Sequence, residues 1–228
     1  IPYQKEQRDH IFSQAMPTKY WGNTFALTAS SNRPCDAIRV LALNDETTVY
    51  INGDSVYTFD FATNPKRYWE FEMGTNGAYA KDGSCMLTTS CPCAVHLFVV
   101  SQRYHGDSKS NGDPAMLWIN PIEQQIDQVT FATYSSKNGT TGHYVNVVTD
   151  QPDLMTLDSL SIASNFKPVS GSNRYHYAQI SLGAVAASHT LKSNGSNFIA
   201  HVYGFTKNES YGYSAGGATK PLTQYITI

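Results

Sequence analysis

Charged side chains are scarce in this chain. Asp, Glu, Lys and Arg make up 15% of its 228 residues, whereas about 25% is typical of soluble domains. Ser, Thr, Asn and Gln must therefore supply most of the polar surface. The formal net charge is -2, so the chain lacks the basic excess that a nucleic acid or an anionic membrane requires of its partner. Together with 15 tyrosines, this composition favours a secreted recognition protein over a cytosolic enzyme.

Long apolar runs and catalytic motifs are also absent from the sequence. No run approaches the roughly 18 apolar residues of a membrane-spanning helix, so we expect no membrane span. The patterns H-E-x-x-H and G-x-S-x-G and the P-loop do not occur, and we predict that the protein is not an enzyme. The chain begins with Ile1 and has no signal peptide, which leads us to expect a processed chain or a fragment of a longer one.

The sequence pattern indicates short β-strands and shows no sustained helical period. Residues 68–73 alternate apolar and polar side chains, and Asn52-Gly53 is the signal of a type I′ hairpin turn. Many short strands at a spacing of roughly 8–12 residues are typical of a sandwich. We predict an all-β, antiparallel β-sandwich of jelly-roll or Greek-key type, built as one sandwich or two packed ones, with at most short helical turns. Residues 1–15 are expected to be a linker or edge extension, and residues 16–228 the domain.

Residues 112–149 are the stretch around which the rest is organised. Gly112-Asp113-Pro114 predicts a turn, and residues 115–119 are interpreted as a short buried strand. Asn120-Pro121-Ile122-Glu123 has the order of an N-cap, a proline at the first helical position and a Glu at the third, so about one turn of helix is expected. The strand predicted at residues 143–149 places Val145 and Val147 on one face, and Tyr144, Asn146 and Val148 on the other.

An even number of cysteines suggests two disulfides with three possible pairings. The four residues are Cys35, Cys85, Cys91 and Cys93. Cys85 and Cys91 would be about 20 Å apart in an extended strand, so they could pair only across a turn. Our preferred pairing joins Cys35 to Cys91 or Cys93 and leaves Cys85 for the remaining one. A zinc site is disfavoured, because Cys91-Pro92-Cys93 is tighter than the usual C-x2-C spacing.

Three N-x-S/T sequences fall in turns rich in Gly or Ser. Their acceptor residues are Asn138, Asn194 and Asn208. Such triplets arise by chance in chains rich in Ser, Thr and Asn, but their place in turns beside expected disulfides favours a eukaryotic secretory route and an extracellular location. N-glycosylation at each of the three is a hypothesis.

Loop carboxylates suggest two further kinds of site. Asp113 and Glu123 flank a strand and could form a glycosidase pair if they lay about 5–10 Å apart across a cleft. Asp107 and Asp113 are candidate calcium ligands, since Ca²⁺ takes hard oxygen ligands from loops. The simpler explanation is that Asp113 belongs to its turn and Glu123 caps its helix. We therefore predict no metal and no cofactor, with calcium as the alternative.

Seven histidines invite a catalytic or metal-binding interpretation. His96 and His201 lie inside strands among apolar residues, which is typical of histidines in a core or pocket. His143 begins a strand, and it could reach Asp113 or Glu123 if the organising stretch folds back on itself. The predicted role of these histidines is structural.

Aromatic residues supply the candidate binding surface. Tyr203, Tyr211 and Tyr213 lie among glycines in a stretch that we predict to be a flexible loop, and Tyr104 and His105 lie in a long polar loop. Tyrosine offers a large contact area and a hydroxyl at low entropic cost, so recognition loops favour it. The alternative is that the tyrosines pack along the edge of a sheet.

Several stretches resemble the N-terminal domain of the IgGFc-binding protein family. The central ones are GDPAM at 112–116, NPIEQ at 120–124 and HYVNVV at 143–148. Further matching stretches are WGNTF at 21–25, TTVYING at 47–53, HVYGF at 201–205 and SYGY at 210–213. Their order and spacing carry the resemblance over nearly the whole chain. The chain departs from the family pattern at Cys91, where the family has a lysine before proline.

The resemblance implies a secreted binding module of the kind found in mucus-associated and other extracellular multidomain proteins, beside repeats of von Willebrand type D. The family name implies immunoglobulin Fc binding, but no matched motif carries that ligand to this chain. Our leading hypothesis is a non-enzymatic extracellular adhesion module that binds a protein or glycan through its loops. One alternative is a structural module that self-associates into matrix or mucus polymers. Another is a carbohydrate-active enzyme domain that uses loop carboxylates.

Overall fold

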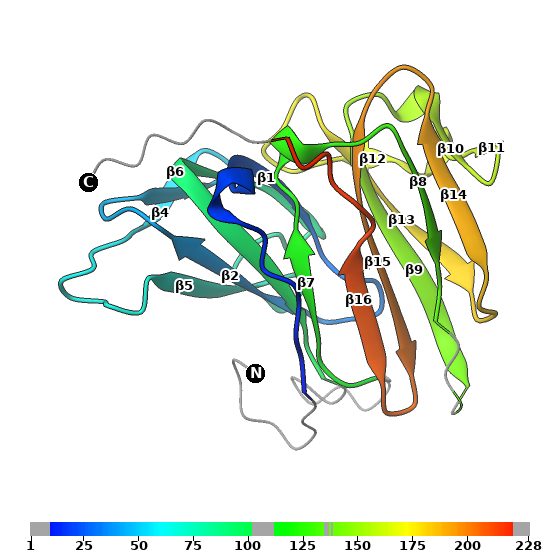
Figure 1. Cartoon of the computed structure of the whole chain (residues 1–228), viewed down its shortest axis with the longest axis horizontal. Coiled ribbons are helices and arrows are strands. Elements are labelled where there is room, and N and C mark those ends of the chain that lie inside the picture. Colours follow the sequence, from blue (N-terminus) through cyan, green and yellow to red (C-terminus); the bar gives the residue numbers. More distant parts are fainter. Residues whose placement is uncertain (1–9, 102–111, 135–136, 138, 221–228) are drawn as a thin grey trace.

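The described part of the chain forms three antiparallel sheets in the computed structural model (Figure 1). The structure describes residues 10–101, 112–134, 137 and 139–220. The helices in these ranges are single 3-10 turns, namely η1 (Thr18–Tyr20), η3 (Ile122–Gln124), η4 (Pro152–Leu154) and η5 (Ala163–Asn165). The predicted all-β, antiparallel fold with short helical turns is confirmed.

The seven-stranded sheet is built around β6. Its order is β4-β3-β6-β2-β5, and β1 and β7 also pair with β6. Its strands are β1 (Gly22–Thr28), β2 (Asp36–Ala42), β3 (Thr48–Ile51), β4 (Asp54–Thr58), β5 (Tyr68–Met73), β6 (Ser84–Val99) and β7 (Ala115–Ile119). Because β6 is long, its first half can pair with β1 and β3 while its second half pairs with β2 and β7.

Two smaller sheets complete the fold. The five-stranded sheet, in the order given, consists of β12 (Lys167–Pro168), β13 (His176–Gly183), β9 (Thr140–Thr149), β15 (Phe198–Thr206) and β16 (Ser210–Ser214). The four-stranded sheet consists of β11 (Leu160–Ser161), β10 (Met155–Leu157), β14 (Ser188–Ser193) and β8 (Gln128–Ala132).

The five-stranded sheet lies between the other two and buries both of its faces (Figure 1). Val145 and Val147 of β9 pack with Leu191 of the four-stranded sheet. Val148, on the opposite face of the same strand, packs with Met86 of the seven-stranded sheet. Successive side chains of a strand point to opposite faces, so the two faces predicted from the alternation in β9 are confirmed. The three sheets therefore form three layers, with the five-stranded sheet in the middle.

The short helix expected after β7 is present as η3, but its capping differs from the prediction. Its N-cap residue is Pro121 and no side chain caps it, so the expected caps by Asn120 and Glu123 are wrong. Glu123 Oε1 instead accepts a hydrogen bond from the backbone N–H of Asn23 at 3.2 Å. The carboxylate is drawn to β1, which begins directly against η3.

Gly22→Ala is expected to destabilise the fold at this junction. A Cβ at Gly22 would lie 2.7 Å from Pro121 Cγ and 2.8 Å from Glu123 Oε2, so β1 would have to move away from η3. Such overpacking costs about 1–3 kcal/mol, and we expect the urea midpoint to fall with an unchanged m-value. Gly217→Ala is the control, since its Cβ meets no atom closer than 3.1 Å. Equal losses in the two variants would contradict the close contact.

The predicted disulfides are wrong for this structure. The free thiols are Cys35, Cys85, Cys91 and Cys93. Ala42 of β2 lies opposite Cys93, and Cys35 precedes Ala42 by seven residues, about 23 Å along the strand. A disulfide needs Cα atoms within about 7 Å. Cys85 lies on the same strand as Cys91 and Cys93, and β6 continues through all three positions.

Burial also makes the thiols in the core around β6 inert. It raises the pKa of Cys85 and of Cys93 to about 12, so both remain protonated near neutral pH. Because the thiolate is the reactive form of cysteine, these residues act as small apolar side chains of the core around β6.

Candidate binding groove

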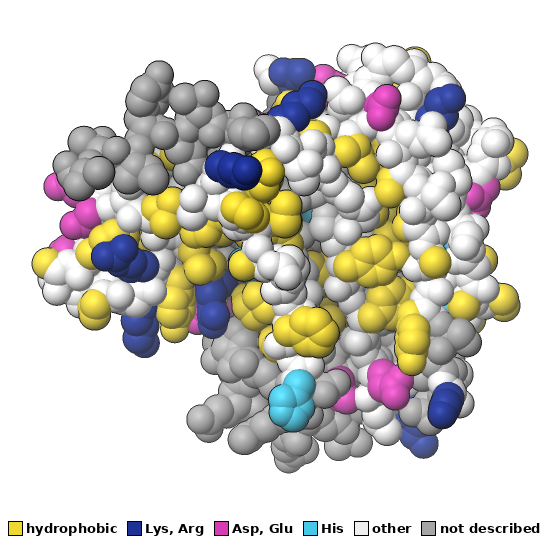
Figure 2. All heavy atoms as spheres, in the orientation of Figure 1, with side chains coloured by type: hydrophobic (Ala, Val, Ile, Leu, Met, Phe, Trp, Pro, Cys, Tyr) yellow, Lys and Arg dark blue, Asp and Glu magenta, His cyan; other side chains and the backbone are white. Residues whose placement is uncertain are grey.

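A groove of about 520 Å³ lies where β7, of the seven-stranded sheet, meets β16, of the five-stranded sheet. Residues 12–16, ahead of η1, supply part of its lining. Its aromatic and sulfur-containing lining residues are Phe12, Met16, Met116, Trp118 and Tyr213. Figure 2 shows hydrophobic side chains gathered over β7 and β16 on this face of the molecule.

The groove depends on a close approach of the two edge strands. A Cβ at Gly212 of β16 would lie 2.6 Å from Leu117 Cδ1 of β7. Any larger residue at this position would push the strands apart, so glycine is required here for close approach of the backbone.

Asn120 fixes the wall of the groove. Its Oδ1 accepts a hydrogen bond from Trp118 Nε1 at 2.9 Å. Its Nδ2 donates to Ser214 Oγ at 2.7 Å and to the carbonyl oxygen of Gly216. This buried amide therefore orients the indole ring and holds the end of β16.

Tyrosine rings continue the apolar surface along β16. The Tyr213 hydroxyl donates to the carbonyl oxygen of Ala132 at 2.5 Å, and the Tyr211 and Tyr213 rings stack with centroids 6.2 Å apart. Tyr134, which is 57% exposed, meets the Tyr211 ring edge-on at 6.1 Å. Residues 210–214 are thus an edge strand and not the flexible loop that we predicted, because β16 pairs with β15 throughout.

The groove offers little for acid–base chemistry. Its lining in the described part of the chain contains no carboxylate, histidine, lysine, arginine or cysteine. Across residues 10–101, 112–134, 137 and 139–220, no three His, Cys, Asp or Glu residues are grouped so that they could hold a metal ion. The arrangement can bury apolar or aromatic groups of a ligand, with a few hydroxyl and amide groups at its rim.

Tyr203 does not belong to this surface. It is 1% exposed and lies between the seven-stranded and five-stranded sheets. Its hydroxyl donates to Asn146 Oδ1 at 2.9 Å and accepts from the backbone N–H of Ser31 at 2.7 Å. The predicted ligand-binding role of Tyr203 is therefore wrong, because its neighbours on β9 and after β1 cover it completely.

The other predicted site residues differ in where they lie. Tyr213 lines the groove, and Tyr211 packs beside it, so their role in binding stays a prediction. Tyr104, His105, Asp107 and Asn138 lie outside the described residues, whereas Asp113, Asn194 and Asn208 are described but do not line the groove.

His96 and His201 lie inside strands, as the sequence indicated. His96 and His201 are buried, and burial lowers the pKa of each to about 4. At His96 the charge of Arg39 adds to this effect. His143 Nδ1 shares a hydrogen bond of 2.7 Å with the Tyr211 hydroxyl. The partner of His143 is thus a tyrosine on β16 and not one of the two carboxylates considered.

Most of the groove could not be read from the sequence. Trp118 and Met116 were expected in a short buried strand, and they are on one, but nothing local shows that this strand is a sheet edge beside β16. Phe12, which is 91% exposed, lies in a stretch without a clear period. A large exposed aromatic residue in a polar segment is the only local signal there.

Comparison with known proteins gives one family match and two structural likenesses. The sequence model of the family described as "IgGFc binding protein" matches residues 1–204. The apo form of the Pleurotus ostreatus lectin matches with a TM-score of 0.22 and 10% identity, over 85% of this chain and 72% of that one. The Pleurotus ostreatus lectin in complex with GalNAc matches with a TM-score of 0.21 and 11% identity, over 83% and 74%. A search of curated proteins gives no significant match.

Proposed function

The chain belongs to the IgGFc-binding protein family, and from this premise we propose that it is an extracellular, non-enzymatic binding module for a protein or glycan ligand. The groove between β7 and β16 carries the proposal. Its volume of about 520 Å³ falls within the roughly 300–1,000 Å³ of ligand sites, which are mostly apolar with a few placed polar groups. Because Asn120 holds its wall in place, little ordering would oppose binding.

The proposed contact surface comes from β7, β16 and the segment ahead of η1. Phe12 and Tyr213 offer aromatic rings, and Met116 offers a flexible apolar side chain that can adapt to a partner. The hydroxyl of Tyr213 is already bonded to β8, so this ring supports contact through its apolar surface. Such anchors are the residues that dominate binding energy in interfaces.

The carboxylates favour binding over catalysis. Glu123, one of the two considered for glycoside hydrolysis, is engaged by the backbone of β1, and neither it nor Asp113 lines the groove. A glycosidase needs two carboxyl groups that face each other across a cleft. The groove is therefore better suited to holding a ligand than to cleaving one.

The extracellular location is part of the same proposal. Family membership supports it, and so do the N-x-S/T sequences at Asn194 and Asn208, whose acceptor residues are both exposed. In the described residues, no helix is long and apolar enough to cross a membrane.

Phe12→Ala and Tyr213→Ala are each expected to weaken binding by about 30-fold, since truncating an aromatic anchor costs about 2 kcal/mol. The assay measures binding of the purified chain to an array of glycans, mucins and immunoglobulin Fc, with and without EDTA. Val185→Ala is the control, because Val185 is also exposed, at 80%, but lies outside the groove. Tyr213→Phe keeps the ring and should keep binding.

Each outcome of the array decides between explanations. Binding that is unchanged in Phe12→Ala and Tyr213→Ala would overturn the groove as the site. Loss of binding in EDTA would favour the calcium alternative. Silence across the array, with self-association that depends on Phe12, would replace ligand recognition by assembly of copies of this chain.

A further inference from the structure

The turn between β14 and β15 holds the triplet Asn194-Gly195-Ser196 at the surface. Asn194 is exposed, and Gly195 adopts φ +108, where an added Cβ would meet no atom within 4 Å. The tip of this turn therefore faces open solvent on the side of Gly195.

Both flanks of the turn are held firmly. The backbone N–H of Asn194 donates to the carbonyl oxygen of Leu154 at 3.0 Å. On the other flank, Ser196 Oγ donates to Asp150 Oδ1 at 2.9 Å, and Thr149 Oγ1 donates to the carbonyl oxygen of Asn197 at 2.9 Å. These hydrogen bonds therefore fix both ends of the turn around Gly195.

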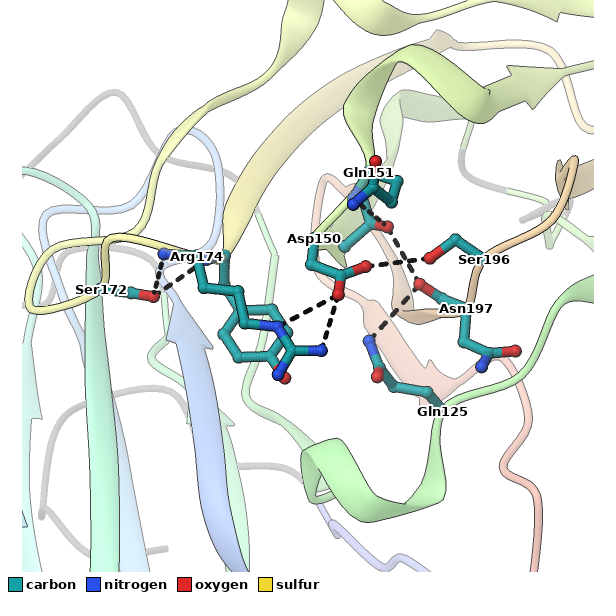
Figure 3. Close-up of polar contacts among 9 residues, drawn as sticks. Gln125, Asp150, Gln151, Ser172, Arg174, Ser196 and Asn197 are labelled. Carbon is teal, nitrogen blue, oxygen red and sulfur yellow. Dashed lines mark hydrogen bonds and ion pairs between the residues drawn. The ribbon is translucent and has the colours of Figure 1, made fainter.

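Asp150 is the centre of this anchor, as Figure 3 shows. Its other oxygen accepts from Arg174 Nη2 at 2.8 Å and from Nε at 3.1 Å. Burial alone would raise the pKa of Asp150, but these bonds and the one from Ser196 outweigh it and lower the pKa. The carboxylate thus stays charged near neutral pH and continues to hold the hydroxyl of the triplet.

The triplet at Asn208 differs in its third residue. Ser210 begins β16, and its Oγ is buried beside Gly112, where an added Cβ would collide with it. The carbonyl oxygen of Glu209 accepts from the backbone N–H of Thr206 at 2.9 Å, so this triplet is built into the β15–β16 hairpin. An enzyme that must reach both the amide and the hydroxyl finds the Asn194 triplet more open.

We propose that Asn194 is an N-glycosylation site of the folded, secreted protein, an inference that rests on the extracellular route of the proposed function. In the reaction, Asn194 Nδ2 attacks the anomeric carbon of a lipid diphosphate-linked oligosaccharide. The new bond is C–N, the bond from that carbon to the phosphate oxygen breaks, the lipid diphosphate leaves, and the amide gives up one proton. Asn194 does not line the groove, so the proposed attachment point lies outside the proposed binding surface.

The test is expression of the whole chain with a secretion signal in eukaryotic cells, followed by intact mass before and after peptide N-glycosidase. Asn194→Gln is expected to remove the mass of one glycan. Ser196→Thr keeps the hydroxyl and should keep the glycan, whereas Ser196→Ala should lose it. Asn208→Gln is the matched control and should retain the Asn194 glycan.

Peptide mapping of the unsubstituted protein makes the result independent of how well the variants fold. After enzymatic release of the glycan, residue 194 should be recovered as aspartate. Recovery of unmodified Asn194 from secreted protein, whether or not Asn208 is occupied, would overturn the proposal. Ligand binding by the Asn194→Gln variant is a separate readout, so a failed glycosylation result would leave the groove untouched.

Discussion

Asp36→Asn is expected to make the loss of folding stability between pH 6 and pH 4 about twice as large. This expectation counts the protons bound by Asp36, His96 and His201. Asp36 is 0% exposed, at the start of β2. Burial raises the pKa of its carboxyl group to about 6, although hydrogen bonds from Ser30 and the charge of Arg33 oppose the shift. The carboxyl group therefore stabilises the fold most when it is protonated.

The sign of the effect follows from the two states of the chain. Between about pH 4 and pH 6 the folded chain keeps the Asp36 proton and the unfolded chain has lost it. The contribution to stability is complete below the unfolded pKa and is lost as pH rises through the folded pKa. A shift of about 2 pKa units corresponds to about 3 kcal/mol. An asparagine at this position has no titrating proton. The variant therefore lacks the contribution that, in acid, opposes the loss of stability caused by His96 and His201.

Urea unfolding at several pH values between 4 and 7 measures the effect. The readout is the slope of the unfolding free energy against pH, which a pH-independent cost of the substitution does not change. Asp54→Asn, on the exposed strand β4, is the control and should leave the slope as it is. Parallel curves for Asp36→Asn and the unsubstituted protein would show that Asp36 titrates alike in the folded and unfolded chain.

Local patterns predicted the parts of the fold that depend on local physics. The alternation in β9 fixed which valines face which sheet, and the proline at η3 placed a helical turn correctly. Side-chain partners were harder, since Glu123 is bound by β1, about a hundred residues earlier in the chain. The carboxyl of Asp36 gave no signal either, because a single Asp before a strand is typical of a turn.

The groove was not predicted and the disulfides were predicted wrongly for the same physical reason. Strand register is a long-range property. Phe12, Trp118 and Tyr213 come from three distant segments, and only the packing of β7, β16 and the segment ahead of η1 brings them together. The even number of cysteines suggested pairs, yet the register of β2 on β6 keeps Cys35 far from Cys93. Composition favours such pairings without supplying the geometry that they need.

His96→Leu and His201→Leu are each expected to reduce the loss of stability that acid causes. Burial lowers the pKa of both histidines to about 4, below the ordinary value of about 6.5. Each therefore contributes stability that is present above about pH 6.5 and is lost as pH falls toward 4, because the unfolded chain takes up the proton first. As pH falls from about 6.5 to about 4, each histidine is expected to cost about 3 kcal/mol of stability. Over the same pH range, each variant should therefore lose about 3 kcal/mol less than the unsubstituted protein.

The two histidines should differ in their effect on binding. The His96 ring meets the Trp118 ring edge-on at 5.2 Å, directly behind the groove wall, whereas His201 lies with Asn146 and Tyr203 between the sheets. A charge on His96 would be placed against both the indole and Arg39, and folded His96 takes up its proton only near pH 4, so acid should weaken ligand binding by the remaining folded protein near that pH. His96→Leu should flatten that pH dependence of the dissociation constant, and His201→Leu should not. Equal pH profiles of binding in the two variants would show that the charge of His96 does not affect binding in the groove. Both histidines would then affect stability alone.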